Sequence, residues 1–273
     1  MRRLLSILAL AIVALPAYPQ TPVRALPDNN LAIPLLITFK NSTGSGFYVK
    51  PSKDVYLVTA KHVLFGADGK ILEPSFNVLS YSNDLADETP NSITVDTTKA
   101  AANIVPHPSE DVAVVKLFSD NPSDATALRT LDGVTAHTMA KNGNIINARL
   151  ATLRKFSDVL VGNDVFLLGF PTSLGLQTMP QIDPHRPLLR KGIVAGLNQH
   201  THSIILDCPA YFGNSGGPVI EADQDSISTR QYNIIGVVNQ YVPYADGGKT
   251  FFIMTNSGYS VATPMDYVLE LVK

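Results

Sequence analysis

The feature that most constrains the fold is a succession of short apolar or alternating runs, each broken by a turn. Such runs are typical of β-strands. The 18 glycines and 19 prolines are spread along the chain, which favours an all-β protein with many turns. The first half holds six candidate strands, at residues 33–39, 46–49, 55–59, 71–79, 103–106 and 112–118. The second half holds six more, at residues 164–169, 192–195, 203–207, 218–221, 232–239 and 250–256.

About six strands in each half indicate two small antiparallel barrels or sandwiches. The stretch 119–150 is polar and is predicted to be an irregular connection, so the first unit spans residues 31–150 and the second 151–273. Near the end of the chain, apolar residues return at helical spacing. They predict a short C-terminal helix with one apolar face, formed by Met265, Val268, Leu269 and Val272.

The N-terminal segment has the pattern of a secretory signal peptide, predicted over residues 1–20. Arg2 and Arg3 precede an apolar run that ends before Pro16, and the run is short beside the roughly 20 residues of a membrane span. Ala17 is a plausible last residue, although Leu15 is large for its position. The sequence therefore predicts export to the periplasm or the exterior, with an uncleaved membrane anchor as the alternative. A polar linker follows at 21–30.

Charge and cysteine content exclude several classes of function. The net charge is −2 without a basic stripe, so nucleic acid is not an expected partner. Two histidines, His200 and His202, have alternate spacing on one strand, but no third ligand matches them, so neither a metal nor another cofactor is expected. Cys208 is the only cysteine, which excludes an internal disulfide and predicts a small buried side chain. Nothing in the sequence indicates the oligomeric state.

The strongest local signal for chemistry is Gly-Asn-Ser-Gly-Gly-Pro at residues 213–218. A serine hydroxyl is a weak nucleophile unless a base removes its proton during attack. A glycine-rich turn around Ser215 can direct successive backbone N–H groups toward a developing oxyanion, because Gly213 has no side chain to block the approach. Taken alone, this pattern is equally consistent with an ordinary turn and with a catalytic serine.

Two further segments carry a base and an acid. His62 ends the apolar strand 56–60, and Asp111 stands directly before the very apolar strand 112–117. An isolated histidine at a strand end is most often structural, and a carboxylate at a strand entry is common. The combination is more specific, because the histidine, the aspartate and the serine follow one another in an order that differs from the α/β-hydrolase and subtilisin arrangements.

These three segments resemble the motifs of the trypsin-like serine proteases. Thr-Ala-Lys-His-Val at 59–63 is similar to the histidine motif, and residues 111–115 and 213–218 are similar to the aspartate and serine motifs. The resemblance is closest to the bacterial HtrA-like branch and extends over residues 35–273. It includes Asn214 before the serine and segments that are similar to that branch at 168–171, 192–194, 204–207 and 256–264. A PDZ domain, usual in that branch, is not found, and residues 173–190 are longer and richer in proline than expected.

The resemblance implies two six-stranded antiparallel barrels with the active site in the cleft between them. It also implies a serine endopeptidase that acts on polypeptides. Ser215 would be the nucleophile, His62 the general base and Asp111 the group that orients it, with the N–H groups of Gly213 and Ser215 as the oxyanion hole. A non-catalytic binding protein with the same fold and an esterase-like hydrolase remain as alternatives. Because Asn214 is uncharged, no activating N-terminal ion pair is expected, so removal of the signal peptide should be sufficient for activity.

The same resemblance assigns the substrate pocket. Its floor falls six positions before the nucleophile, at Pro209, and its other walls are assigned to Ala210, Tyr211, Asn239, Gln240 and Tyr241. No carboxylate stands at the floor, so a buried lysine or arginine of the substrate would be unpaired. We therefore expect cleavage after small or medium apolar residues.

Overall fold

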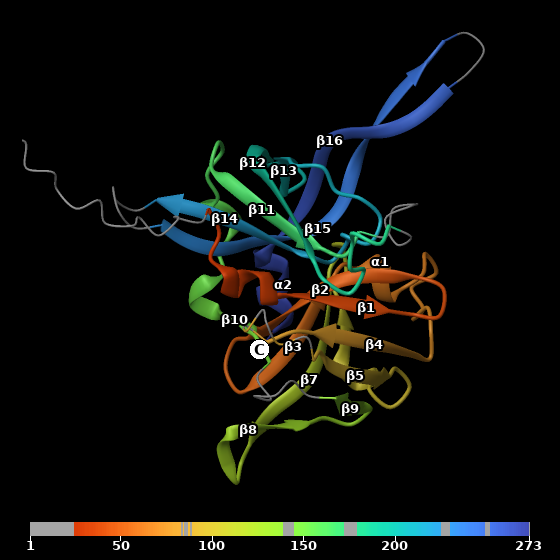
Figure 1. Cartoon of the computed structure of the whole chain (residues 1–273), viewed down its shortest axis with the longest axis vertical. Coiled ribbons are helices and arrows are strands. Elements are labelled where there is room, and N and C mark those ends of the chain that lie inside the picture. Colours follow the sequence, from red (N-terminus) through yellow and green to blue (C-terminus); the bar gives the residue numbers. More distant parts are fainter. Residues whose placement is uncertain are drawn as a thin grey trace, which may run out of the picture.

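The structure is a computed structural model, and it describes residues 25–82, 84, 87, 89–138, 145–171, 179–224, 230–248 and 252–272. The signal segment predicted at 1–20 lies outside the described residues, as do linker residues 21–24 and, within the long loop, residues 173–178. The remainder of the expected linker is not entirely polar surface, because Leu26 is buried and a 3₁₀ turn, η1 (Asp28–Ala32), begins within it. Figure 1 shows the two halves of the chain as two β-structures packed on one another.

The first half folds into one strongly curved sheet, a half-barrel, with ten strands in the described part of the chain. The strand order is β6-β7-β3-β2-β1-β4-β5-β9, while β8 pairs with β7, and β10 pairs in parallel with β2. The strands are β1 (Pro34–Thr38), β2 (Thr43–Lys50), β3 (Asp54–Thr59), β4 (Ser75–Ser80), β5 (Asn91–Asp96), β6 (Ile104–Pro106), β7 (Ala113–Asn121), β8 (Asp124–Thr130), β9 (Val134–Thr138) and β10 (Asn147–Arg149).

The second half closes into a six-stranded barrel in the order β11-β12-β13-β16-β15-β14. Its strands are antiparallel neighbours: β11 (Asp164–Gly169), β12 (Leu188–Asn198), β13 (Ser203–Asp207), β14 (Pro218–Gln224), β15 (Arg230–Gly247) and β16 (Phe252–Pro264). The helix α2 (Met265–Leu271) follows, one residue before the end of the described chain. The prediction of an all-β protein with two antiparallel sheets and a short C-terminal helix is confirmed.

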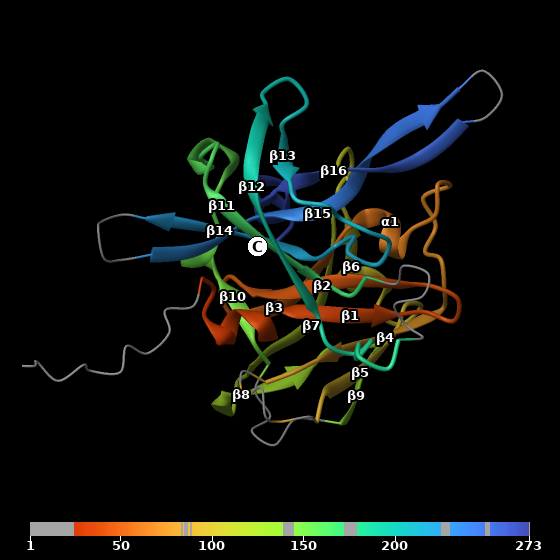
Figure 2. The same cartoon turned by 45° about the horizontal axis from the view of Figure 1, so that its top comes forward.

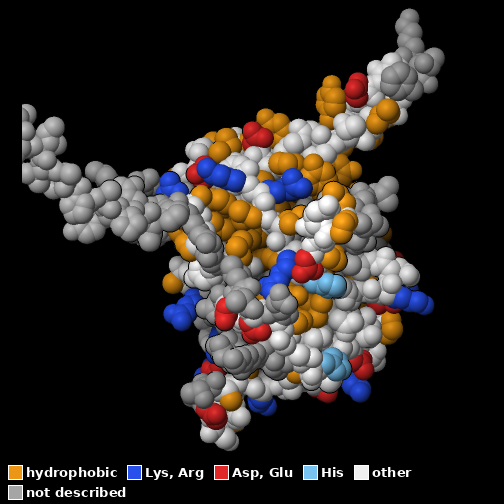
Figure 3. Space-filling model, viewed as in Figure 1, with side chains coloured by type: hydrophobic (Ala, Val, Ile, Leu, Met, Phe, Trp, Pro, Cys, Tyr) orange, Lys and Arg blue, Asp and Glu red, His pale blue; other side chains and the backbone are white. Residues whose placement is uncertain are grey.

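Strands β15 and β16 extend well beyond the barrel as a two-stranded arm, which projects from the body in Figures 1 and 2. The register pairs Pro243 with Asn256 and Gly247 with Phe252 along this arm. Several of its apolar side chains are exposed, and Figure 3 shows hydrophobic surface along it: Tyr244, Phe252, Ile253 and Met254.

Three apolar cores explain why the central strands are buried on both sides. Tyr48 and Leu57 point into the core of the first sheet, whereas Phe47 and Val58, their neighbours in sequence, belong to a second core between the halves. Alternation along β2 and β3 therefore places side chains in two different apolar environments. Helix α2 contributes the fully buried Met265 to the core between the halves, and the third core fills the second barrel.

Several local predictions are wrong. The stretch 119–150 is not irregular, because it contains the end of β7 and all of β8, β9 and β10. Strand β5 was not predicted, although its burial alternates residue by residue, and the strand expected at 71–79 begins only at Ser75. The first sheet consequently has ten strands rather than six. No helix in the described part of the chain is long and apolar enough to cross a membrane.

Candidate active site

His62 is placed by a short helix directly after β3. Helix α1 (Lys61–Leu64) follows Ala60, and its buried Val63 and Leu64 hold it against the first core. The side chain of His62 remains half exposed. Lys61 also fixes this turn, because its Nζ donates a hydrogen bond to the backbone carbonyl of His107 at 2.8 Å.

Asp111 contacts His62 twice. Its Oδ1 accepts the backbone N–H of His62 at 2.9 Å, and its Oδ2 lies 2.7 Å from Nδ1 of the imidazole ring. An ionised carboxylate can only accept, so Nδ1 carries a proton in this contact, and in the neutral ring Nε2 is then the acceptor. Val112, which is fully buried, anchors the loop where it enters β7. This is the geometry of a histidine oriented to act as a base through Nε2.

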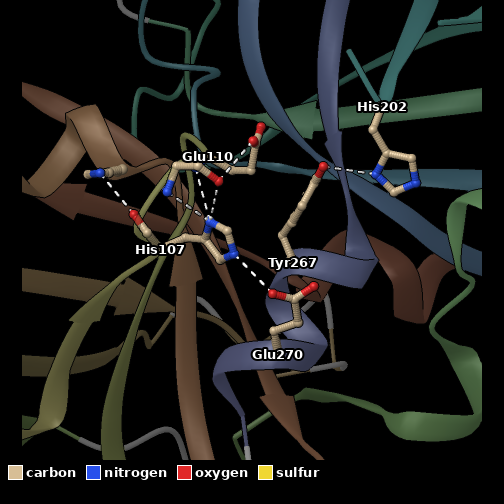
Figure 4. Close-up of polar contacts among 7 residues, drawn as sticks. His107, Glu110, His202, Tyr267 and Glu270 are labelled. Carbon is tan, nitrogen blue, oxygen red and sulfur yellow. Dashed lines mark hydrogen bonds and ion pairs between the residues drawn. The ribbon is translucent and has the colours of Figure 1, made fainter. Parts of the chain in front are cut away.

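The loop that carries Asp111 is tied to the C-terminal helix through His107 (Figure 4). His107 is buried, and its Nδ1 accepts the backbone N–H of Glu110 at 3.0 Å. On the other side of the ring, Nε2 lies 3.2 Å from a carboxylate oxygen of Glu270 on α2. The His107 backbone N–H donates to the carbonyl of Val112 at 2.9 Å, so bonds to His107 enclose Asp111 on both sides.

Ser215 lies in the turn that joins β13 to β14. Gly213 and Gly216 have φ angles of 91° and 87°, a left-handed conformation that favours glycine. The turn is closed by reciprocal bonds: Asn214 N–H donates to Tyr211 O, and Tyr211 N–H donates to Asn214 Oδ1, both at 2.9 Å. Among the described residues, the N–H groups of Gly213 and Ser215 have no hydrogen-bond acceptor, as an oxyanion hole requires.

The Ser215 hydroxyl does not donate to His62 in this structure. Its Oγ donates instead to the backbone carbonyl of Asn239 on β15, at 3.1 Å. This acceptor was not predicted, because a backbone carbonyl leaves no mark in the sequence.

One cavity of about 340 Å³ brings the predicted residues together. His62, Asp111 and Ser215 all border it, although the first two follow or precede strands of the first sheet and the third precedes a strand of the second barrel. The lining also includes most of the predicted pocket wall: Ala210, Tyr211, Asn239, Gln240 and Tyr241, together with Phe212 and Val238. Neither Pro209 nor Gly213 is among the lining residues. Phe212, which is expected near the pocket from its position beside Tyr211, packs its ring edge-on against Tyr241 with centroids 5.8 Å apart.

Residues 44–227 match the family model of the trypsin-like peptidase domain. The chain belongs to the trypsin-like peptidase family. The matched region contains all three residues that meet in the cavity, and it covers more than half of the chain. The family predicted from the histidine, aspartate and serine segments is therefore confirmed.

Comparison with other proteins gives two kinds of result. No curated protein matches the sequence of the peptidase. Similar solved structures include the HtrA-type protease AlgW with tripeptide, at 20% identity, and the serine endoprotease from Yersinia pestis, at 14%, each with a TM-score of 0.47. The alignments cover 88% and 92% of this chain but only 58% and 66% of those chains. This chain thus spans less than two thirds of the length of either protein.

Two other predictions concern cysteine and metal. Cys208 is free and buried, and burial raises the pKa of its thiol to about 11, so it is not a thiolate nucleophile. His202 Nδ1 lies 3.0 Å from the hydroxyl of Tyr267 (Figure 4), and His200 is exposed. In the part of the chain that the structure describes, no three His, Cys, Asp or Glu residues are grouped so that they could hold a metal ion.

Proposed function

We propose that this peptidase is a serine endopeptidase that uses Ser215, His62 and Asp111 as a catalytic triad. The observation that carries the proposal is the pair of bonds from Asp111 to His62, in a cavity that Ser215 also borders. A carboxylate that holds both the backbone and Nδ1 of a histidine leaves its Nε2 oriented as a base, which a merely structural histidine does not need.

The chemistry follows from these contacts. The Ser215 hydroxyl turns from the carbonyl of Asn239 to Nε2 of His62 and attacks the scissile carbonyl as the proton passes to the imidazole. Asp111 stabilises the imidazolium, and the N–H groups of Gly213 and Ser215 donate to the oxyanion. His62 then protonates the leaving amine, and water hydrolyses the acyl-enzyme by the reverse sequence.

A fluorophosphonate probe tests this assignment. Such a probe forms a covalent bond only with an activated serine, so we expect stoichiometric labelling of wild-type protein at Ser215 and none of Ser215→Ala. Absence of labelling in folded wild-type protein would favour the binding-protein alternative. If labelling occurs, comparison of a peptide library with simple esters separates the endopeptidase from an esterase-like hydrolase.

We further propose that the enzyme cleaves after small or medium apolar residues. Asp111 is the one carboxylate among the described residues that line the cavity, and His62 already occupies it. The guanidinium of Arg190 lies 4.4 Å from the centroid of the Tyr211 ring and places positive charge beside the cavity. A lysine or arginine of the substrate would therefore enter unpaired, at a cost of several kcal/mol.

Peptide-library profiling measures this preference directly. We expect cleavage after Val, Ala or Leu, with discrimination of only about 1–3 kcal/mol among them because they differ by a few methylenes. Dominant cleavage after lysine or arginine would contradict the assignment of the pocket.

The substrates are proposed to be exported polypeptides, because residues 1–20 have the pattern of a secretory signal. N-terminal sequencing of the mature protein tests cleavage of that segment, and an intact N-terminus would favour the membrane-anchored alternative.

A further inference from the structure

Ser45 lies in the first sheet, yet its contacts are with the serine turn of the second barrel. It occupies β2, between Gly44 and Gly46, and it is completely buried. It does not border the cavity that contains His62 and Ser215, so it has no direct access to substrate. Thr59, at the end of β3, fixes Ser45 from behind by donating its hydroxyl to the Ser45 carbonyl at 2.7 Å.

Three hydrogen bonds connect Ser45 to the second barrel. Its backbone N–H donates to the carbonyl of Ser215 at 2.9 Å, and its Oγ donates to the carbonyl of Gly213 at 2.6 Å. The same Oγ accepts the backbone N–H of Phe170, just after β11, at 3.0 Å. One side chain and its own amide therefore hold the carbonyls on both sides of Asn214, directly around the nucleophile.

We infer that Ser45 is a positioning residue for the oxyanion hole. The two bonded carbonyls belong to the 213–214 and 215–216 peptide planes, which lie on either side of the 214–215 plane that carries the Ser215 N–H. Fixing both flanking planes toward β2 restricts rotation of the plane between them, and fixing the 213–214 plane also restricts the adjoining plane that carries the Gly213 N–H, so both N–H groups keep their orientation toward the reacting carbonyl. The inference rests on the proposed function, because the hole acts only when an oxyanion forms during attack by Ser215. It goes beyond the proposed function because it assigns the orientation of the oxyanion-hole donors to a residue of the first half, whereas Ser215 belongs to the second.

The packing of the turn leaves it little freedom to find another arrangement. A Cβ at Gly216 would lie 2.1 Å from the carbonyl oxygen of Ser45, and one at Gly169 would lie 2.8 Å from its Oγ. The turn thus touches Ser45 without intervening space, and a displacement of the Ser45 hydroxyl is transmitted to it directly. Asn214, which is uncharged and bonded to Tyr211, supplies the remaining constraint from within the turn.

The test uses two variants of Ser45 and a matched control. Ser45→Ala removes the hydroxyl, whereas Ser45→Cys keeps a side chain of similar size with only a weak donor and leaves no cavity. The control is Thr97→Val, which removes another buried hydroxyl bonded to a backbone carbonyl of the first half, that of Glu73 at 2.9 Å, and which does not border the cavity of His62 and Ser215. For each variant, kcat, KM, the melting temperature and the inhibition constant of a peptide boronic acid are measured with an apolar peptide amide as substrate.

We expect both Ser45 variants to lose kcat by roughly 10- to 100-fold while KM stays within about twofold, because a misplaced oxyanion donor acts on the transition state alone. Affinity for the boronic acid, which mimics the tetrahedral intermediate, should fall in proportion to kcat/KM. Thr97→Val should lower the melting temperature to a similar degree and leave kcat unchanged.

Two results would overturn the inference. One is a kcat within twofold of wild type in a folded Ser45→Cys or Ser45→Ala variant. The other is a loss that resides in KM, with unchanged affinity for the boronic acid. If Ser45→Ala does not fold, Ser45→Cys decides the question. Failure of the proposed function is a different outcome, because wild-type protein would then neither hydrolyse the peptide nor react with a fluorophosphonate.

Discussion

At the scale of single residues, Asp111 makes the most testable contribution to the proposed mechanism. In Asp111→Asn, an amide nitrogen facing Nδ1 of His62 would act as a donor, so Nδ1 must accept and Nε2 must carry the proton. The ring then has the wrong tautomer to take a proton from Ser215. We expect kcat to fall by about 10⁴-fold, as measured by peptide hydrolysis, with the fold retained.

The neighbouring carboxylate provides the control for this prediction. Glu110→Gln makes the same chemical change one residue earlier, on a side chain that accepts a hydrogen bond from the hydroxyl of Ser109 at 3.1 Å and has no hydrogen bond to His62 among the described residues. It should keep kcat within about twofold of wild type. A loss of less than tenfold in Asp111→Asn would show that the carboxylate does not set the tautomer of His62.

The residues of the site differ in how far the sequence revealed them. His62, Asp111 and Ser215 each stand within several residues of characteristic flanking sequence, so they could be found without the fold. Ser45 and His107 could not, because their partners lie far away in the sequence: Gly213 is 168 residues from Ser45, and Glu270 is 163 residues from His107. Their contacts arise only when the two halves and helix α2 come together.

At the scale of elements, the serine turn depends on glycines for two separate reasons that substitution can distinguish. Gly216 has a φ of 87°, and an added Cβ would meet the Ser45 carbonyl and the Thr59 hydroxyl at 2.1 and 2.2 Å. Gly258 in β16 has a similar φ of 91°, but nothing lies within 4 Å of its Cβ position. Gly258→Ala thus introduces conformational strain alone, and Gly216→Ala introduces strain and overlap.

We expect Gly216→Ala to lower kcat on the order of 100-fold, because the turn must move away from Ser45 and carries the nucleophile with it. Gly258→Ala should retain wild-type kcat and lose only about 1–3 kcal/mol of stability from strain. Steady-state kinetics and thermal unfolding of the two variants measure this contrast. Equal kcat in both variants would mean that the turn tolerates displacement.

The strands illustrate where sequence patterns lose their predictive value. Runs such as those of β3 and β11 are continuously apolar because both faces are buried, and they were predicted closely. Strands β8 and β9 lie in a polar stretch, where hydrogen bonding to β7 and β5 rather than burial defines them. For β9, only Val134 is buried, so the apolar signal is almost absent.

At the scale of the whole molecule, the two halves share a core and an active site. The pattern of strands and turns in the sequence predicts two sheets and a terminal helix, but it does not predict the parallel pairing of β10 with β2. Pairing partners depend on register across distant segments, which local periodicity does not encode. The shared core, built from side chains of β2, β11 and α2, holds the first sheet against the barrel that carries Ser215.

A buried carboxylate in the second barrel leads us to expect that the stability of the whole fold depends on pH. Glu221 on β14 is fully buried. Its Oε1 accepts hydrogen bonds from the N–H of Leu160 at 3.1 Å and from the side-chain amide of Asn163 at 3.0 Å. Its Oε2 has no partner among the described residues. Desolvation raises the pKa of this carboxyl above its ordinary value of 4.5.

The folded protein therefore binds this proton more tightly than the unfolded chain does. Protonation of Glu221 favours the fold, and this contribution is lost as pH rises from 4.5 through the raised pKa of the folded state. Glu221→Gln keeps an acceptor for Leu160 and Asn163 but cannot ionise. We expect the variant to match wild type near pH 4.5 and to be more stable at pH 8, by roughly 2–4 °C in melting temperature for each kcal/mol gained.

Calorimetric melting curves between pH 4 and pH 8 measure this difference. An exposed carboxylate, Asp132, supplies the control, because Asp132→Asn should give a melting temperature that follows wild type at every pH. Glu221 lies outside the proposed catalytic cavity, so peptide hydrolysis by Glu221→Gln should equal that of wild type. A stability difference that shrinks as pH rises would reverse the sign of the argument, since ionised Glu221 would then be favoured by the folded state.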